Sequence, residues 1–269
     1  MLQFDFMKRA LIAGLLLSIM IPSIGVVMVN RRTSMIGDAL SHTSLAGVGL
    51  GLIFGFDPVI GAVIVCIISA FSIERIREKL PQFGDMATAI IMSTGLGIAA
   101  ILSDFAPGGN TFESYLFGSI SSITSLDLRN IVIIFIPFII MSVIFYGSIL
   151  DISIDPNLAR MAGVRVKVVN AVFTLFTAIT VALAAKIVGA LLVASLIVLP
   201  VATVLIVSRS YKQTYIFSVV LGVIYTILGI ITSYYLDVKP GGAIVINAVI
   251  GMLLILSYGK FRRVKIKTS

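Results

Sequence analysis

Long, uninterrupted apolar runs constrain this sequence more than any other feature. Most of them approach the roughly 20 residues that an α-helix needs to cross a bilayer, and short polar segments separate them. Apolar residues fill each run instead of following one stripe of a helix, which is typical of membrane-buried helices. The runs cover residues 10–29, 34–55, 57–73, 86–103, 127–149, 168–185, 187–208, 214–235 and 241–258.

Composition excludes a water-soluble fold. Of the 269 residues, 59% are hydrophobic and only 12% are charged, whereas soluble domains carry about a quarter charged residues. A chain of this length cannot enclose so much apolar surface in a core surrounded by water. We therefore predict an all-α, polytopic transmembrane bundle of about nine spans that occupies residues 1–269 as one domain. Because the run after Asp57-Pro58 is short, eight spans plus a re-entrant segment is the alternative.

The basic residues that give the chain its net charge of +8 lie between the apolar runs and at the C-terminus, not along an amphipathic face. This distribution argues against nucleic acid as a partner and is typical of loops that face an anionic membrane leaflet. Alternating spans put fifteen of the 20 basic residues on one side, which predicts that this side and the C-terminus are cytoplasmic. The fifteen are Arg31, Arg32, Arg75, Arg77, Lys79, Arg160, Arg165, Lys167, Arg209, Lys212, Lys260, Arg262, Arg263, Lys265 and Lys267.

The most informative polar residues inside a predicted span are Asp38 and His42. They are four residues apart, so a helix places them on one face, and His42 is the only histidine in the chain. His42 would lie on the order of 12 Å past the start of its span, near the middle of the membrane. A carboxylate and an imidazole on one face form half a site for a divalent cation such as zinc or manganese. Two copies of the chain would together supply four ligands.

A purely structural role for the same pair is the alternative. In that interpretation Asp38 caps its helix and His42 bonds a neighbouring carbonyl group. Polar groups inside a membrane are costly unless they are used, so the sequence leaves the two interpretations open.

A second candidate element lies in the largest inner loop. Asp155 suits the N-cap of a helix, Pro156 its first position, and Gly163 its C-terminal stop. The pattern predicts a helix of about two turns on the cytoplasmic face. The pattern alone does not separate a docking helix from a surface connector without a partner.

Missing motifs exclude several activities. The sequence has no G-x-x-x-x-G-K-[ST] motif, so the chain does not hydrolyse ATP through a P-loop, and it lacks the G-x-S-x-G and H-E-x-x-H motifs of hydrolases. Its single cysteine, Cys66, rules out a thiolate-rich metal site. We predict a transport subunit, not an enzyme. A stand-alone secondary transporter or cation channel is the rival, although Asp38 is the only acid that we place inside a span.

A resemblance to a known family rests on segments spread over the whole chain. They are Gly37–Val48, Tyr115–Ile120, Asp155–Val164, Val188–Val193, Leu199–Thr203 and Asp237–Gly242. In order, they resemble the signature, the outer-loop motif, the cytoplasmic coupling helix and the later landmarks of the metal-ion ABC permeases, the zinc and manganese uptake group. The resemblance implies a type II ABC importer-like permease in the bacterial cytoplasmic membrane.

The family resemblance also implies partners. These are a second copy of the permease, a separate cytoplasmic ATP-binding subunit that hydrolyses ATP, and an extracytoplasmic metal-binding protein. No cofactor is bound permanently, since the metal ion is the cargo. Asp38 and His42 would line its path.

The ATPase would dock on the inner-loop helix. The residues that the resemblance assigns to this contact are Asp155, Pro156, Arg160, Gly163 and Val164. The segment after His42, Thr43–Gly47, resembles the corresponding segment of zinc permeases, whereas manganese permeases more often have Ala-Val-Leu-Pro-Gly there. Zinc is therefore the predicted ion, with manganese or iron as the alternative.

Overall fold

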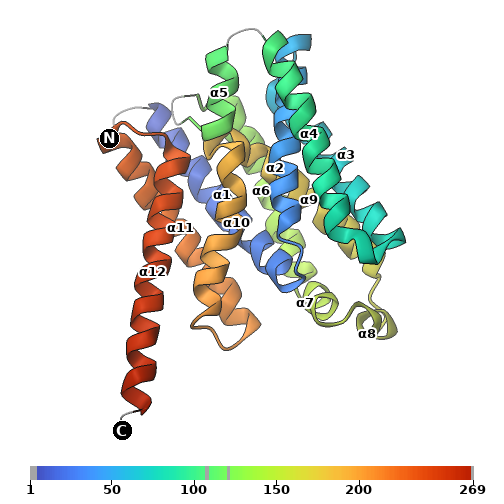
Figure 1. Cartoon of the computed structure of the whole chain (residues 1–269), viewed down its shortest axis with the longest axis vertical. Helices are drawn as coiled ribbons and strands as arrows, with labels where there is room; N and C mark the ends of the chain where they lie inside the picture. Colours follow the sequence, from blue (N-terminus) through green and yellow to red (C-terminus); the bar gives the residue numbers. More distant parts are fainter. Residues whose placement is uncertain (1–4, 107–108, 120–121, 268–269) are drawn as a thin grey trace.

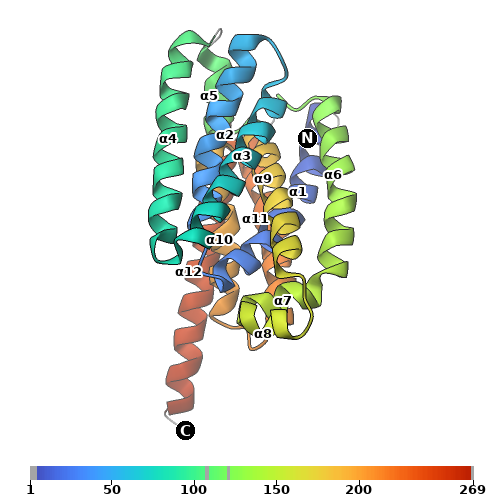
Figure 2. The same ribbon diagram turned by 90° about the vertical axis from the view of Figure 1, so that its right-hand side faces the viewer.

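The computed structural model describes residues 5–106, 109–119 and 122–267, and all regular elements in these ranges are helical (Figures 1 and 2). The helices are α1 (Asp5–Asn30), α2 (Met35–Phe54), α3 (Pro58–Lys79), η1 (Pro81–Phe83), α4 (Gly84–Phe105), α5 (Gly109–Phe117), α6 (Ser125–Ile144), α7 (Tyr146–Ile154), α8 (Pro156–Met161), α9 (Val166–Ile187), α10 (Ala190–Leu205), α11 (Tyr211–Leu236) and α12 (Pro240–Lys267). The predicted all-α membrane bundle is confirmed.

The predicted count of nine spans is too high. Within the described residues, seven helices are long and apolar enough to cross a membrane. They are α1, α3, α4, α6, α9, α11 and the Pro240–Ser257 part of α12. The run after Asp57-Pro58 is one of them, because Asp57 caps α3 and the helix continues to Lys79.

The two remaining predicted runs form α2 and α10. Helix α2 begins with a polar stretch that contains Asp38 and His42, and α10 has only 16 residues because the chain turns at Gly189, where φ is +96°. Both helices run between the two ends of the bundle (Figures 1 and 2). Helix α2 packs against α3, α4, α9 and α10, so protein covers much of its surface and it does not need the apolar character of a lipid-facing helix.

The long predicted run 127–149 is divided. Helix α6 ends at Ile144, and Phe145 separates it from α7, which turns along the end of the bundle. By contrast, the division predicted at Lys186 is close to the observed one, since α9 ends at Ile187.

The connections gather the charged residues at the two ends of the bundle. The α1–α2 and α10–α11 connectors, helix α8 and the end of α12 lie at one end, which is the lower end in Figure 1. These are the segments that carry most of the fifteen basic residues assigned to the cytoplasmic side. Helix α5 and the α9–α10 connector lie at the opposite end.

Close approach of α2 to α3 holds the central helix in place. A side chain at Gly47 would meet the backbone of Gly61 and Ala62, and a side chain at Gly61 would meet the backbone of Gly47. Small residues of this kind let membrane helices pack backbone against backbone. The contact fixes the helix that presents Asp38 and His42.

Candidate functional site

Asp38 and His42 lie one turn apart near the start of α2. The distance between Asp38 Oδ1 and His42 Nε2 is 3.6 Å, and the side chains are 34% and 18% exposed. The structure therefore brings the two predicted ligands together on one helical face. Both remain accessible from the surface of the single chain.

The structural alternative is not what the structure contains. Helix α2 begins after Ser34, whose side chain makes no capping bond, and within the described residues no hydrogen bond joins Asp38 to a backbone amide or His42 to a carbonyl group. The hydroxyl groups nearby are satisfied within the helix: Ser41 donates to the Gly37 carbonyl at 2.8 Å and Ser44 to the Ser41 carbonyl at 2.6 Å. The Asp38 carboxylate and the His42 imidazole are thus the polar groups of this stretch that remain without such hydrogen bonds.

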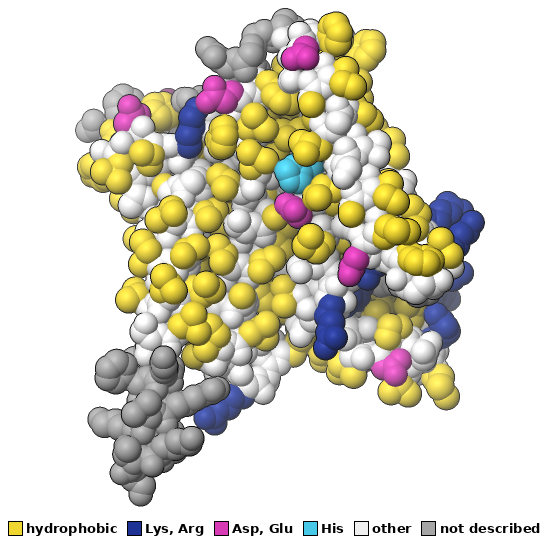
Figure 3. Space-filling model, viewed as in Figure 1, with side chains coloured by type: hydrophobic (Ala, Val, Ile, Leu, Met, Phe, Trp, Pro, Cys, Tyr) yellow, Lys and Arg dark blue, Asp and Glu magenta, His cyan; other side chains and the backbone are white. Residues whose placement is uncertain are grey.

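Asp38 and His42 have no third potential metal ligand beside them in the described residues. No group of three or more His, Cys, Asp or Glu side chains that could hold a metal ion occurs in the described part of the chain. The Nδ1 atom of His42 is buried and has no hydrogen-bond partner. Figure 3 shows the histidine, in cyan, on a mainly hydrophobic face at mid-height of the bundle. A carboxylate and an imidazole that are accessible on such a face are costly in a membrane unless a partner covers them.

The predicted inner-loop helix is confirmed as α8. The Asp155 carboxylate accepts hydrogen bonds from the amides of Asn157 at 2.7 Å and Leu158 at 3.3 Å, and Pro156 occupies the first position. Gly163 adopts φ +86°, and the Val164 amide donates to the Ala159 carbonyl at 3.0 Å. This left-handed stop requires glycine. The helix protrudes at the basic end of the bundle (Figures 1 and 2).

The outer surface of α8 carries apolar residues that sequence reasoning missed. Leu158 is 62% exposed and Met161 85% exposed, next to the exposed Arg160, whereas Ala159 faces inward. Leu158 and Met161, large apolar residues three positions apart on either side of Arg160, were the available signal in the sequence. Exposed apolar side chains beside polar ones at one end of the bundle are typical of a protein contact.

Three of the resembling segments meet at the opposite end of the bundle. Side chains added at Gly118, Gly189 or Gly241 would all collide with backbone atoms there: Gly118 with Val188, Gly189 with Phe117, and Gly241 with Val188. The Ser119 amide donates to the Lys186 carbonyl at 3.3 Å. Ile120, the last residue of the predicted outer-loop motif, lies outside the described residues. These glycines are explained by close backbone packing between α5, α9, α10 and α12.

A buried ion pair at this end was also missed. Lys186 Nζ lies 2.7 Å from Asp127 Oδ2, and the same oxygen accepts from the amide of Thr124 at 2.8 Å and from its hydroxyl at 2.6 Å. Asp127 lies in α6, one of the seven candidate spans, so the expectation that Asp38 is the only acid inside a span is wrong. Asp127 is fully paired, which separates it from Asp38.

Comparisons with known proteins agree with this geometry. The model of the ABC 3 transport family matches residues 3–259. The chain is 29% identical to the high-affinity zinc uptake system membrane protein ZnuB of Haemophilus influenzae, over 97% of this chain and 100% of ZnuB. It is 28% identical to the manganese import system permease protein ScaB of Streptococcus parasanguinis, over 94% and 90% of the two chains. The solved structure of PsaBC from Streptococcus pneumoniae in complex with a Fab superposes with a TM-score of 0.84 and 27% identity, covering 94% of this chain and 91% of that one.

Proposed function

Because the chain belongs to the ABC 3 transport family and is a metal-importer permease, we propose that it carries zinc into the cell through a site built from Asp38 and His42 of two copies. The accessible Asp38–His42 pair on an apolar face carries the proposal, since neither side chain has the partners that a structural role would supply. The stand-alone transporter or channel considered from the sequence is set aside by the family match.

The number of ligands favours zinc. Two copies would bring two carboxylates and two imidazoles, and zinc is almost always held tetrahedrally by four such ligands. Manganese prefers more ligands and more oxygen atoms. The described part of the chain offers no third acidic or imidazole ligand beside the pair.

Manganese is the second candidate. The chain is as similar to the manganese permease ScaB as to the zinc permease ZnuB, at 28% and 29% identity. Water molecules would have to complete its coordination. The competition experiment below separates the two ions.

In this proposal, helix α8 forms the contact with the ATP-binding subunit. Its exposed Leu158 and Met161, together with Arg160, would enter a groove on a separate cytoplasmic ATPase, and Asp155 and Gly163 would hold its two ends. The clustering of basic residues at the same end supports a cytoplasmic location for α8 and for the C-terminus. The end that bears α5 would then receive the ion from an extracytoplasmic metal-binding protein.

Metal competition tests the proposed cargo. Cells that lack this chain are complemented with it, and uptake of radiolabelled zinc is measured with an excess of unlabelled zinc or unlabelled manganese. We expect unlabelled zinc to suppress uptake and the same concentration of manganese to leave most of it. Manganese that competes as well as zinc, together with zinc-sensitive uptake of labelled manganese, would assign the second candidate.

A further inference from the structure

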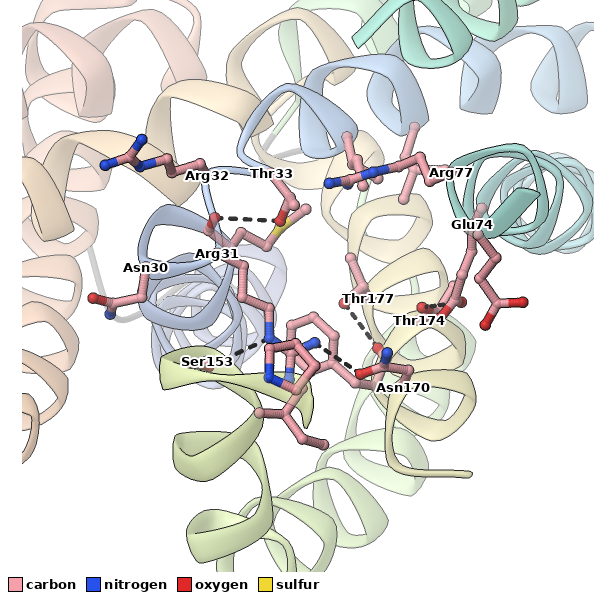
Figure 4. Close-up of a pocket in the computed structure, with 18 residues that line it drawn as sticks. Asn30, Arg31, Arg32, Thr33, Glu74, Arg77, Ser153, Asn170, Thr174 and Thr177 are labelled. Atoms are coloured by element: carbon pink, nitrogen blue, oxygen red, sulfur yellow. Dashed lines mark hydrogen bonds between the residues drawn. The ribbon is translucent and has the colours of Figure 1, made fainter. Parts of the chain in front are cut away.

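A cavity of about 520 Å³ lies at the basic end of the bundle (Figure 4). Its walls come from the α1–α2 connector with the adjoining ends of both helices, from α3, and from α7, α8 and α9. It therefore lies between the start of α2, the helix that carries Asp38 and His42, and the segment that leads into α8. One side chain, Arg31, extends from the connector to the α7–α9 wall (Figure 4).

Arg31 joins three elements that are distant in the sequence. Its Nε donates to the Ser153 hydroxyl of α7 at 3.3 Å, and its Nη1 donates to the Asn170 side-chain carbonyl of α9 at 3.0 Å. The guanidinium carbon lies 5.4 Å from the centre of the Phe173 ring, within range of a cation–π contact.

The surroundings of this charge are unusual. No carboxylate bonds Arg31 in the described structure, and its Nη2 is buried without a partner. Burial lowers the pKa of the guanidinium, while Tyr211 and Glu74 act in the opposite direction. Glu74 lines the same cavity, but its carboxylate accepts from the Thr174 hydroxyl at 2.7 Å. Well-packed apolar residues stabilise a fold at least as well as buried charges do, so packing alone does not explain an arginine here.

The connector that carries Arg31 is short and stiff. The Thr33 amide donates to the Met28 carbonyl at 2.8 Å, and Arg32 is held in the left-handed region at φ +54°. Helix α2 starts two residues after Thr33 and presents Asp38 in its first turn. A displacement of the Arg31 side chain would therefore move the start of α2 with little slack.

The other end of the link lies beside α8. Ser153 stands two residues before Asp155, the N-cap of α8, and the Asp155 amide is tied back to the Asp151 carbonyl at 3.0 Å. The bond between Ser153 and Arg31 is thus the described polar contact that joins α7, immediately before α8, to the connector that begins α2.

We propose that Arg31 is a positioning residue that transmits movement of the α7–α8 segment to α2 and so couples ATP hydrolysis to release of the metal ion. The inference rests on the proposed function, because it needs an ATPase on α8 and an ion at Asp38 and His42. It adds the residue that connects them. The Nη2 atom of Arg31 has no hydrogen-bond partner, so it can bond a new acceptor when the α7–α8 segment moves.

The test uses the complete complex of permease and ATPase in proteoliposomes. Arg31→Met removes both hydrogen bonds and keeps the bulk of the side chain. We expect the zinc ions carried per ATP hydrolysed to fall about tenfold, a size typical of coupling-network mutations, while ATP hydrolysis and ATPase binding persist. Arg209→Met is the matched control, because Arg209 is an exposed arginine in the α10–α11 connector at the same end of the bundle and does not line the cavity. This control variant should carry as many zinc ions per ATP hydrolysed as the unmodified complex.

A second variant keeps the proposal testable if Arg31→Met fails to assemble. Ser153→Ala removes one acceptor with a minimal change of shape, and it should lower the same ratio by a smaller factor. Combined with Arg31→Met it should add nothing, since both changes break one link. A normal ratio in Arg31→Met, a normal ratio in Ser153→Ala, or additive losses in the double variant would overturn the inference.

Failure of the proposed function would look different. If the unmodified chain neither binds an ATPase nor carries zinc, the proposed function falls and the inference falls with it. If the unmodified complex does both and Arg31→Met behaves like it, only the role of Arg31 is wrong.

Discussion

Asp127 and Asp38 occupy the first turns of their helices, but their carboxylates have opposite surroundings. Asp127 receives hydrogen bonds from Thr124 and Lys186. Among the described residues, Asp38 has only the imidazole of His42 as a partner, at 3.6 Å. A carboxylate with several donors has little capacity left for a cation, whereas one beside a single imidazole can still bind one. The same residue type therefore stabilises the fold in α6, and in the proposed function it binds the cargo ion in α2.

The Asp127–Lys186 pair gives a stability prediction. Lys186→Met leaves the Asp127 carboxylate buried without its cation and should lower the free energy of unfolding by about 3 kcal/mol. Asp127→Asn together with Lys186→Met should cost less than the two single changes combined, because the stranded charge is gone. Denaturation midpoints in one detergent measure all three variants. Equal and additive losses would mean that the pair does not interact.

At the scale of elements, α8 combines a strong local signal with an exposed apolar surface. A cysteine in place of Met161, which is 85% exposed, should react with a membrane-impermeant thiol reagent in inverted vesicles but not in intact cells. Added ATPase should protect it. The native Cys66 is buried and should not react with the reagent.

Asp104→Cys is the control for this labelling experiment, because Asp104 is exposed near the end of α4, at the opposite end of the bundle. It should react in intact cells and be indifferent to the ATPase. Labelling of Met161→Cys from outside would reverse the orientation, and unchanged labelling with bound ATPase would remove α8 from the interface.

Elements whose signals are local could be predicted, and those that depend on distant contacts could not. Asp155 and Gly163 marked the ends of α8, because a cap and a left-handed stop act within a few residues. The Lys186–Asp127 pair spans 59 positions and the Arg31–Asn170 bond spans 139. The sequence around these residues gives no indication of which distant residue each one contacts. The Asp38–His42 pair was found because four residues make one helical turn.

At the scale of the whole molecule, the enclosure of α2 explains both an error and the site. The sequence shows α2 as one of nine apolar runs, but its polar first turns keep it out of the seven helices that are apolar enough to cross a membrane, and α3, α4, α9 and α10 enclose it instead. The same enclosure allows α2 to carry an acid and the only histidine at membrane depth. In the proposed function, a second copy of the chain covers the accessible side of that pair and completes four ligands.

Uptake of radiolabelled zinc by the Asp38→Asn, His42→Gln double variant tests this account most directly. Asn keeps the shape of Asp, and Gln approximates the length of His, but both amides are poor zinc ligands. We therefore predict uptake at the level of cells without the chain, with insertion and ATPase binding unchanged. Asp85→Asn, which alters an exposed acid in the first turn of α4, should transport normally. Zinc uptake by the double variant at the rate of the unmodified protein would show that the pair does not hold the ion.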